Sequence, residues 1–215
     1  VLDSLAAAGR VPETIIVGVN HASEKRFSEY MPQKVAEGFS ASLRDSLADR
    51  ISHPVYSDDF LAFLTQELKP RIDSEFRTRP DATHTFIAGS SMGGLISMYA
   101  LCEYPEVFAG ALCLSTHWTV SIDNSTPEVG NHWVAYLSEN LPAGKKWYFD
   151  YGTEGLDRFY EPYQMRVDSV MVEKGYRQRQ DWWTFKYSGH DHNERFWNQR
   201  LHRPFQLILG ELSVR

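Results

Sequence analysis

Cysteine is scarce in this chain, and long apolar runs are missing. Only Cys102 and Cys113 occur among 215 residues, and both fall in segments with the pattern of buried structure. We therefore expect two small core side chains, with neither a disulfide nor a cysteine nucleophile. No apolar stretch approaches the roughly 20 residues that a membrane-spanning helix needs, so we expect no membrane span.

Positive charge is also in short supply. Lys and Arg number 22 against 28 Asp and Glu, which leaves a net charge of −6. This balance argues against nucleic acid or an anionic membrane surface as the main partner. An initiator methionine and a signal peptide are missing too, because the chain begins Val1-Leu2-Asp3. We expect an upstream segment to have been cleaved or omitted, and the compartment stays open between cytoplasmic and exported.

The sequence also lacks repeats, low-complexity tracts and linkers, so we expect a single domain over residues 1–215. Five short apolar runs alternate with helical patterns, which is typical of a parallel α/β sheet. The expected strands are residues 14–19 (TIIVGV), 83–88 (THTFIA), 110–115 (GALCLS), 146–151 (KWYFDY) and 183–188 (WTFKYS). The expected helices are residues 57–76 with a kink at Pro70, 95–104, 131–140, 161–174 and 195–209, with a weaker signal at 42–50. This predicts a mostly parallel sheet flanked by helices in three layers.

The segment GSSMGG, residues 89–94, lies between the second expected strand and the helix that follows it. This is the context in which G-x-S-x-G forms a nucleophile elbow. The tight turn predicts a strained backbone at Ser91, and we expect a Cβ at Gly89 or Gly93 to collide with the crossing strand and helix. The helix N-terminus would point amides at a developing oxyanion. A glycine-rich turn without chemistry is the alternative.

A serine nucleophile needs a base to take its proton and an acid to hold the base in one tautomer. On a parallel sheet these follow in the order Ser, Asp or Glu, His, at successive strand ends. The loop after the fourth expected strand offers Glu154 and Asp157, and the loop after the fifth offers His190 and His192. Both choices stay open from the residues alone. We expect no metal, because histidines two apart in an extended segment point to opposite sides and no third ligand is evident.

Four segments of the chain resemble the esterase D-like branch of the α/β-hydrolases, which includes enterochelin and feruloyl esterases and the mycolyltransferases. They read IIVGVNHASEKRFSEYMP (15–32), FIAGSSMGGLISMYALCEYPEVF (86–108), YFDYGTEGLDRFYEPYQ (148–164) and SGHDHNERFWNQRL (188–201). The resemblance implies an α/β-hydrolase fold and a serine esterase without metal or organic cofactor. It begins in the middle of the family's domain, so we expect this chain to be part of a longer esterase. The missing piece would include a strand beside the nucleophile strand.

The resemblance also implies roles for particular residues. It makes Ser91 the nucleophile, His192 the base and Asp157 the acid, with His190 and Glu154 in reserve. The Met92 amide would donate to the oxyanion. The family's second oxyanion donor lies in the missing part, and three substitutes are open. They are a strand formed by residues 1–8, a dimer partner, and a loop donor such as Asn20.

The same resemblance points to the rim of the site. Arg26 and Tyr30 match an R-x-x-E-Y-x-P stretch, which we expect to shape the rim, with a substrate contact as the alternative. Trp118 resembles a position near the family's pocket, so we expect it to form part of the pocket wall.

The predicted function is hydrolysis of a carboxylic ester through an acyl-enzyme. The expected substrate is a small-molecule or carbohydrate-linked ester, and a homo-oligomer stays open. Acyl transfer to another alcohol by the same three residues is one alternative. The other is a non-catalytic binding module in which aromatic side chains stack on a sugar or aryl ring. The candidate aromatic residues are Trp118, Trp133, Tyr160 and Tyr163.

Overall fold

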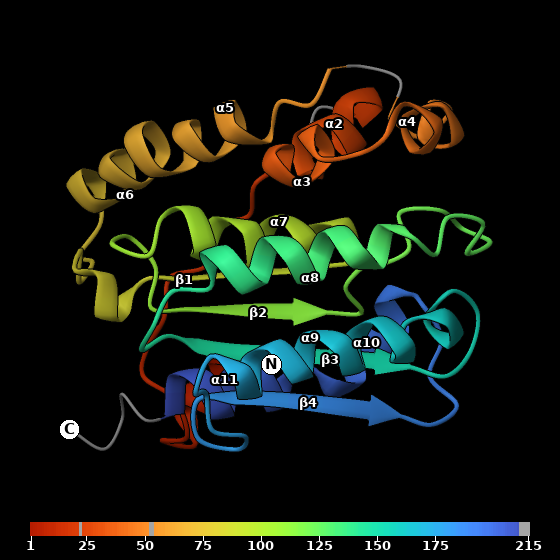
Figure 1. Cartoon of the computed structure of the whole chain (residues 1–215). Coiled ribbons are helices and arrows are strands. Elements are labelled where there is room, and N and C mark those ends of the chain that lie inside the picture. The colour runs from red at the N-terminus through yellow and green to blue at the C-terminus, as the bar shows by residue number, and fades with distance from the viewer. Residues whose placement is uncertain (22, 52–53, 211–215) are drawn as a thin grey trace.

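The computed structural model describes residues 1–21, 23–51 and 54–210. Within these residues, four parallel strands form one sheet in the spatial order β1-β2-β3-β4 (Figure 1). The strands are β1 (Phe86–Ser90), β2 (Gly110–Leu114), β3 (Lys146–Gly152) and β4 (Trp182–Tyr187). All four match expected strands to within three residues at each end, and their carboxyl ends lie along one edge of the sheet.

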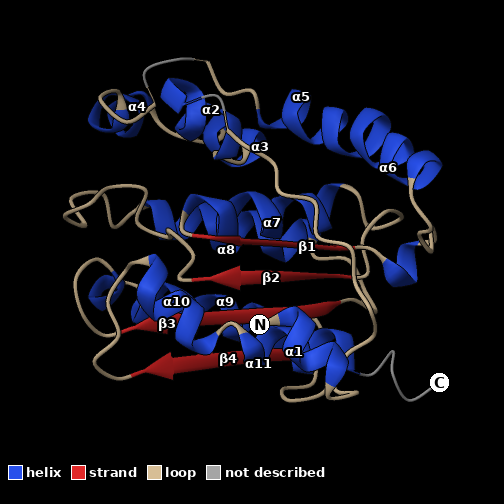
Figure 2. Cartoon of the chain, turned by 180° about the vertical axis from the view of Figure 1, so that it is seen from behind, coloured by secondary structure: helices blue, strands red, loops and turns tan. Residues whose placement is uncertain are grey.

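Helices cover both faces of the sheet. On one face lie α7 (Met92–Glu103), α8 (Val129–Asn140) and α9 (Glu161–Glu173), as Figure 1 shows. On the other face lie α1 (Leu2–Ala7), α10 (Glu194–Arg200) and α11 (His202–Leu209), seen in front in Figure 2. The parallel sheet flanked by helices is therefore confirmed.

A further group of helices lies outside α7 and beyond β1 (Figure 1). It consists of α2 (Arg26–Tyr30), α3 (Gln33–Glu37), α4 (Ala41–Leu47), α5 (Ser57–Ala62), the π-helical stretch η2 (Phe63–Leu68) and α6 (Lys69–Glu75). Three short 3₁₀ turns are η1 (Ser23–Lys25), η3 (Ala82–His84) and η4 (Asp157–Phe159). The described helices include none long and apolar enough to cross a bilayer.

Side chains of the central strands alternate between two hydrophobic clusters, one on each face of the sheet. Ala111 and Cys113 of β2 join the cluster under α7, α8 and α9. Leu112 and Leu114, their neighbours in the chain, join the cluster formed with α1 and α11. This period of two is what a strand buried on both faces requires. Cys113 and Cys102 are both free and buried, as expected.

The expected strand at residues 14–19 is wrong. This segment is irregular, and Ile15, Ile16 and Val17 are exposed, Ile16 to 68%. β-branched residues favour a strand, but a strand forms only where a neighbour pairs with its backbone. Within the described residues β1 pairs with β2 alone, so β1 is an edge strand and its Ala88 is exposed.

The amino-terminal segment was one candidate for the second oxyanion donor, on the expectation that it forms a strand. Residues 1–8 do not form a strand, because Leu2–Ala7 is the helix α1. Leu2 and Leu5 are one helical turn apart, and both pack in the cluster that contains Ile208 and Leu209 of α11. Burial of this face holds α1 on the far side of the sheet from α7.

Two expected helices are irregular. The helix at 57–76 runs through α5, η2 and α6, and the π-helical stretch η2 ends two residues before Pro70. Because proline removes one backbone donor and crowds the preceding turn, a widened turn accommodates it. The helix at 195–209 is divided at Leu201 into α10 and α11, and Pro204 lies in the first turn of α11, where proline is tolerated.

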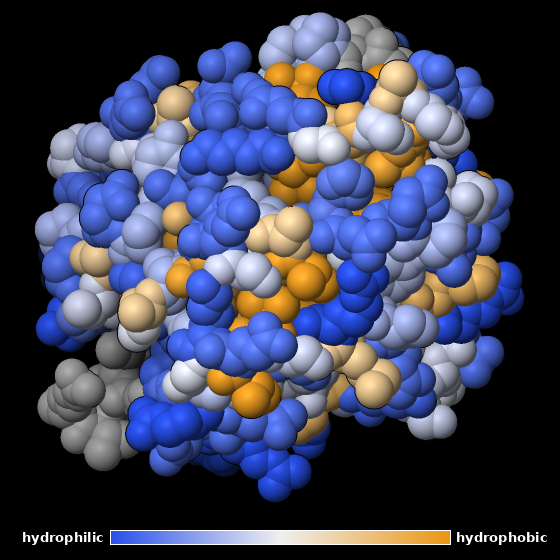
Figure 3. Space-filling model, viewed as in Figure 1, coloured by the Kyte–Doolittle hydropathy of each residue, from blue (hydrophilic) through white to orange (hydrophobic). Residues whose placement is uncertain are grey.

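Polar side chains join the outer helices to α7. The Tyr99 hydroxyl donates to Asp58 Oδ1 at 2.6 Å, and Lys34 pairs with Glu103. Between α3 and α4 lies a pocket of about 490 Å³ lined mainly by apolar side chains, including Phe39 and Leu47. Figure 3 shows hydrophobic side chains at the surface in this upper part of the molecule.

Candidate active site

Ser91 occupies the sharp turn between β1 and α7. Its backbone angles are φ 60° and ψ −125°, which costs a non-glycine residue about 1–3 kcal/mol. Four backbone hydrogen bonds hold this conformation. The Ser91 amide donates to the Leu114 carbonyl at 2.9 Å, and the Ser91 carbonyl accepts from the amides of Gly94, Leu95 and His117. The strained turn predicted from the sequence is present.

The glycines of the turn differ in whether a Cβ would fit at their position. A Cβ on Gly89 would lie 2.3 Å from the Gly93 carbonyl oxygen, and one on Gly94 would lie 2.9 Å from Thr116 Oγ1. A Cβ on Gly93 would have no described atom within 4 Å, so the collision expected there is wrong. The strand meets the helix backbone at Gly89, which is where the close approach requires the absence of a side chain.

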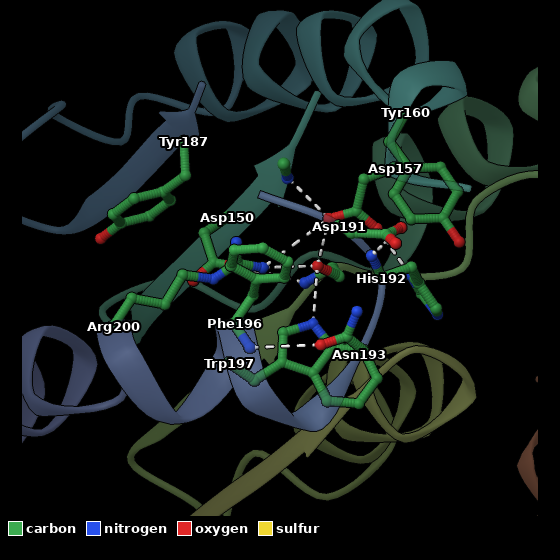
Figure 4. A network of polar contacts seen from close by, with 12 residues as sticks. Asp150, Asp157, Tyr160, Tyr187, Asp191, His192, Asn193, Phe196, Trp197 and Arg200 are labelled. Carbon is green, nitrogen blue, oxygen red and sulfur yellow. Dashed lines mark hydrogen bonds and ion pairs between the residues drawn. The ribbon is translucent and has the colours of Figure 1, made fainter. Parts of the chain in front are cut away.

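Three polar side chains from distant parts of the chain meet above this turn. His192 Nε2 lies 2.9 Å from Ser91 Oγ. His192 Nδ1 lies 2.5 Å from Asp157 Oδ1 (Figure 4). Asp157 begins η4 after β3, and His192 lies in the loop between β4 and α10. Ser91 is 8% exposed and Asp157 is fully buried. A carboxylate can only accept, so the proton lies on Nδ1 and Nε2 can accept the hydroxyl proton of Ser91.

The two reserve residues lie elsewhere. Glu154 is exposed, and its carboxylate accepts from Thr153 Oγ1. The His190 ring packs on Tyr187 and Phe196, while its carbonyl accepts from the amides of Thr153 and Glu154. The His190 backbone thus joins the loop after β4 to the loop after β3. The structure brings Asp157 and His192 to Ser91, and keeps Glu154 and His190 away from it.

The amino end of α7 faces the same turn. Met92 is the first residue of this helix, and the first amides of a helix have no carbonyl partner within it. The Met92 amide is therefore available to an anion that forms beside Ser91. Asn20, considered as a second donor, is exposed in the irregular segment before η1.

The model of the Putative esterase family matches residues 1–207. The chain belongs to this family. Among curated proteins it is similar to the uncharacterised protein YbbA of Bacillus subtilis, with 24% identity over 186 residues that make up 83% of this chain and 67% of that protein.

Solved structures of similar fold include the enterobactin esterase FES of Shigella flexneri, with 18% identity and a TM-score of 0.69 over 98% of this chain. An IroE-like serine hydrolase of Shewanella oneidensis gives 19% identity and a TM-score of 0.71 over 97% of this chain. The chain spans 48% of the enterobactin esterase chain and 64% of the IroE-like one. At this level of identity, the likeness shows a shared fold.

Two buried carboxyl groups near the site of this esterase-family chain differ in acidity. Burial alone would raise the pKa of Asp157, but hydrogen bonds from His192 and Ser115 outweigh it and hold that pKa below its ordinary value. Burial raises the pKa of Asp150 to about 6, although Arg200 lies 3.0 Å away. Asp157 is therefore anionic at neutral pH, as a partner of an imidazole N–H should be.

His117, a buried histidine beside His192, was not among the residues predicted from the sequence. The two ring centres are 6.2 Å apart. His117 Nε2 lies 3.1 Å from the Val120 carbonyl, so Nε2 carries the proton, and Nδ1 accepts from the Tyr160 hydroxyl at 2.7 Å. Burial lowers the pKa of His117 to about 3, so this ring stays neutral beside His192. Its place just after β2, at the same sheet edge as the elbow, is the signal that could have found it.

The aromatic residues expected at the rim are buried in the core. Trp118 is 1% exposed, and its Nε1 donates to Gln164, so its predicted place in the pocket wall is wrong. Trp133, Tyr160 and Tyr163 are buried as well. After β2 the chain turns inward, and large apolar rings gain more from burial in the core than from exposure at the rim.

The R-x-x-E-Y-x-P stretch forms α2 and the residues after it. Arg26 is half-buried, with its guanidinium carbon 5.9 Å from the centre of the Tyr30 ring. The Tyr30 ring in turn packs against Phe60 of α5. The intervening Phe27 lies edge-on to His117, with ring centres 6.2 Å apart. This stretch therefore packs the outer helices together and, through Phe27, reaches His117.

The two glycines of the elbow give a direct test of the turn. We expect Gly89→Ala to lower the free energy of unfolding by about 3 kcal/mol or more, because its Cβ would collide with backbone atoms that cannot move aside. Gly93→Ala should change it by less than about 1 kcal/mol. Urea denaturation followed by circular dichroism measures both, and equal losses would contradict the packing of this turn.

His117 should make stability fall in acid. Below about pH 6.5 the unfolded chain takes up a proton on this histidine, whereas the folded protein does so only near pH 3. Protons then favour the unfolded state, so the free energy of unfolding should decline by about 1.4 kcal/mol more per pH unit than in His117→Asn between pH 6 and 4. Denaturant titrations at several pH values give the two slopes. Parallel slopes would mean that His117 is not held neutral.

Proposed function

We propose that the protein is a serine-dependent carboxylic ester hydrolase in which Ser91, His192 and Asp157 form a catalytic triad. The observation that carries this proposal is the continuous contact from Ser91 Oγ to His192 Nε2 at 2.9 Å and from His192 Nδ1 to Asp157 Oδ1 at 2.5 Å. Membership in the Putative esterase family supports an esterase activity. The neighbours among solved structures, which include a ferulic acid esterase with a TM-score of 0.58, support the same class.

In the proposed mechanism, Ser91 Oγ attacks the acyl carbonyl of the ester while His192 Nε2 takes the hydroxyl proton. His192 then gives this proton to the departing alcohol, which leaves the acyl group on Ser91. Water attacks the acyl-enzyme in the same way, with His192 again as base, and releases the carboxylic acid. Asp157 keeps the imidazole in the tautomer that presents Nε2 to Ser91 and stabilises the imidazolium.

The Met92 amide is the proposed donor to the oxyanion of each tetrahedral intermediate. It lies at the amino end of α7, next to the nucleophile. One such donor contributes about 2.7–4 kcal/mol to catalysis. Asn20 stays a prediction as a second donor.

The expected substrate remains a small-molecule or carbohydrate-linked ester, and hydrolysis and acyl transfer would use the same three residues. The alternative of a non-catalytic module that stacks aromatic side chains on a sugar loses its support. That alternative depended on Trp118, Trp133, Tyr160 and Tyr163, and all four are buried.

Replacement of the nucleophile should abolish activity. We expect Ser91→Ala to reduce hydrolysis of p-nitrophenyl acetate by at least about 10³-fold and to prevent labelling by a fluorophosphonate probe. The neighbouring variant Ser90→Ala should still be labelled, because the Ser91 hydroxyl is intact. Labelling of the Ser91→Ala protein, or turnover at the wild-type rate, would refute the assignment.

The acid should be Asp157 and not Glu154. Asp157→Asn should lower kcat by about 10⁴-fold, because an amide at this position can donate to Nδ1 and so favour the wrong tautomer of His192. Glu154→Gln is the matched control, since its side chain is exposed and bonded only to a neighbour, and its kcat should stay within about twofold. Steady-state kinetics on both variants decide, and a large loss in Glu154→Gln with an active Asp157→Asn would reverse the roles.

A further inference from the structure

A mostly buried polar cluster lies behind Asp157, and its Trp197 also packs edge-on against the His192 ring, with the ring centres 5.1 Å apart. It consists of Ser115, Asp150, Trp197 and Arg200. Ser115 directly follows β2, Asp150 is in β3, and Trp197 and Arg200 are on α10. Figure 4 shows Trp197 and Arg200 pointing from α10 toward Asp150 and Asp157. Arg200 is only 1% exposed, which is unusual for an arginine.

Only one assignment of donors and acceptors fits the hydrogen bonds of the Ser115 hydroxyl. Its Oγ lies 2.9 Å from Trp197 Nε1 and 2.5 Å from Arg200 Nη2. Indole and guanidinium nitrogens only donate, so they occupy both lone pairs of the hydroxyl. The one hydroxyl hydrogen must then point to Asp157 Oδ2, which lies 2.5 Å away. A cationic donor behind the hydroxyl makes it a stronger donor in turn.

The same reasoning extends through the carboxylate of Asp157. Oδ2 accepts from Ser115 Oγ and from the Gly152 amide at 2.6 Å. Oδ1 is left for His192 Nδ1. Three donors in three directions define the plane of the carboxylate, and this plane defines which way the imidazole of His192 points.

Stability alone is a poor explanation for the buried arginine. Within the described chain, Arg200 Nε and Nη1 have no hydrogen-bond partner, and the guanidinium packs on the Tyr187 ring with its carbon 4.9 Å from the ring centre. Nη2 lies 3.0 Å from Asp150 Oδ1, but the cost of desolvation offsets most of the gain from a buried ion pair. Arg200 has another feature that an ordinary buried ion pair lacks: its charged guanidinium lies close to both Ser115 and Asp157.

Asp150 holds the arginine in place. Its Oδ1 also accepts from the Ser115 amide at 3.0 Å, and its Oδ2 accepts from the Tyr148 hydroxyl at 2.9 Å. The carboxylate is thus bonded to the residue that follows β2 and to a side chain of its own strand β3, so Arg200 meets an anion that is held in place.

His192 and the two donors to Ser115 also belong to one segment of the chain, α10 and the residues just before it. His192 is separated by one residue from α10, whose first turn is capped by the Asn193 side chain. Trp197 and Arg200 are three residues apart on α10, so they share a face of this helix. The helix therefore sets the position of His192 and of the two donors to Ser115 together.

We propose that Ser115 and Arg200 are positioning residues for the reaction, with Arg200 polarising the Ser115 hydroxyl that orients Asp157 and, through it, the tautomer of His192. This inference rests on the proposed function. It adds two residues that do not touch the substrate to the three that carry the chemistry.

The Ser115 hydroxyl can be removed in two ways. Ser115→Ala should lower kcat for p-nitrophenyl acetate by about 10- to 100-fold with KM within about twofold, because a hydrogen bond to a charged acid is lost while the substrate site is intact. Ser115 has φ 42°, a conformation that suits glycine, so Ser115→Gly provides a second variant without the hydroxyl. The control is Ser57→Ala, which removes another fully buried serine hydroxyl that accepts from the Gln33 amide far from the site.

The charge is tested with Arg200→Met and Arg200→Lys. We expect Arg200→Met to lower kcat at least as much as Ser115→Ala, and Arg200→Lys to recover part of the loss because it keeps the charge. A spectroscopic readout accompanies the kinetics, namely the downfield proton resonance of His192 Nδ1–H. It should shift or disappear in Ser115→Ala and Arg200→Met and stay unchanged in Ser57→Ala.

The two proposals fail in different ways. If the wild-type protein neither hydrolyses the ester nor reacts with a fluorophosphonate at Ser91, the proposed function is wrong. If the wild type is active while folded Ser115→Ala and Ser115→Gly proteins keep its kcat and its Nδ1 resonance, the positioning role is overturned. Circular dichroism establishes folding for each variant.

Discussion

The candidate site depends on the register of three parallel strands. Ser90 of β1 pairs with Leu114 of β2, and Leu114 pairs with Asp150 of β3. The strands therefore bring Ser91, Ser115 and the loop after Asp150 to the same edge of the sheet. Because parallel strands all present their carboxyl ends at one edge, segments more than 60 residues apart in sequence contribute to one small site. A slip of one residue in this pairing would separate Ser91 from the groups around it.

A carboxylate buried this deeply needs hydrogen-bond donors. Asp157 is fully buried, and its two oxygens accept from a histidine, a serine and a backbone amide. In a surrounding of low polarity each of these bonds is stronger than in water, and each unmade one would be costly. The strained backbone of Ser91 is likewise held in place by four backbone hydrogen bonds. The hydrogen bonds around Asp157 and Ser91 thus hold both residues in place.

Much of the fold could be predicted from local pattern. The strands β1 to β4 correspond to apolar runs, and the elbow follows from glycine spacing between a strand and a helix. The run at residues 14–19 has the same β-branched composition, yet it is irregular and exposed. Composition indicates only that a segment could form a strand. Backbone pairing with a neighbouring strand decides whether it does. For a similar reason Trp118 could not be placed, since a tryptophan after a strand suits a pocket wall and a core equally well.

The residue types of the site and their order along the chain were readable from the sequence, because a nucleophile elbow and polar strand ends are local features. The choice of Asp157 over Glu154 and of His192 over His190 was not. These candidates are two or three residues apart in loops, and their directions depend on the His190 carbonyl, which binds the amides of Thr153 and Glu154. Nor could any local pattern connect Ser115 with Arg200, 85 residues further along. Contacts of this kind arise only when helices pack on a finished sheet, and their geometry is absent from the propensity of any single segment.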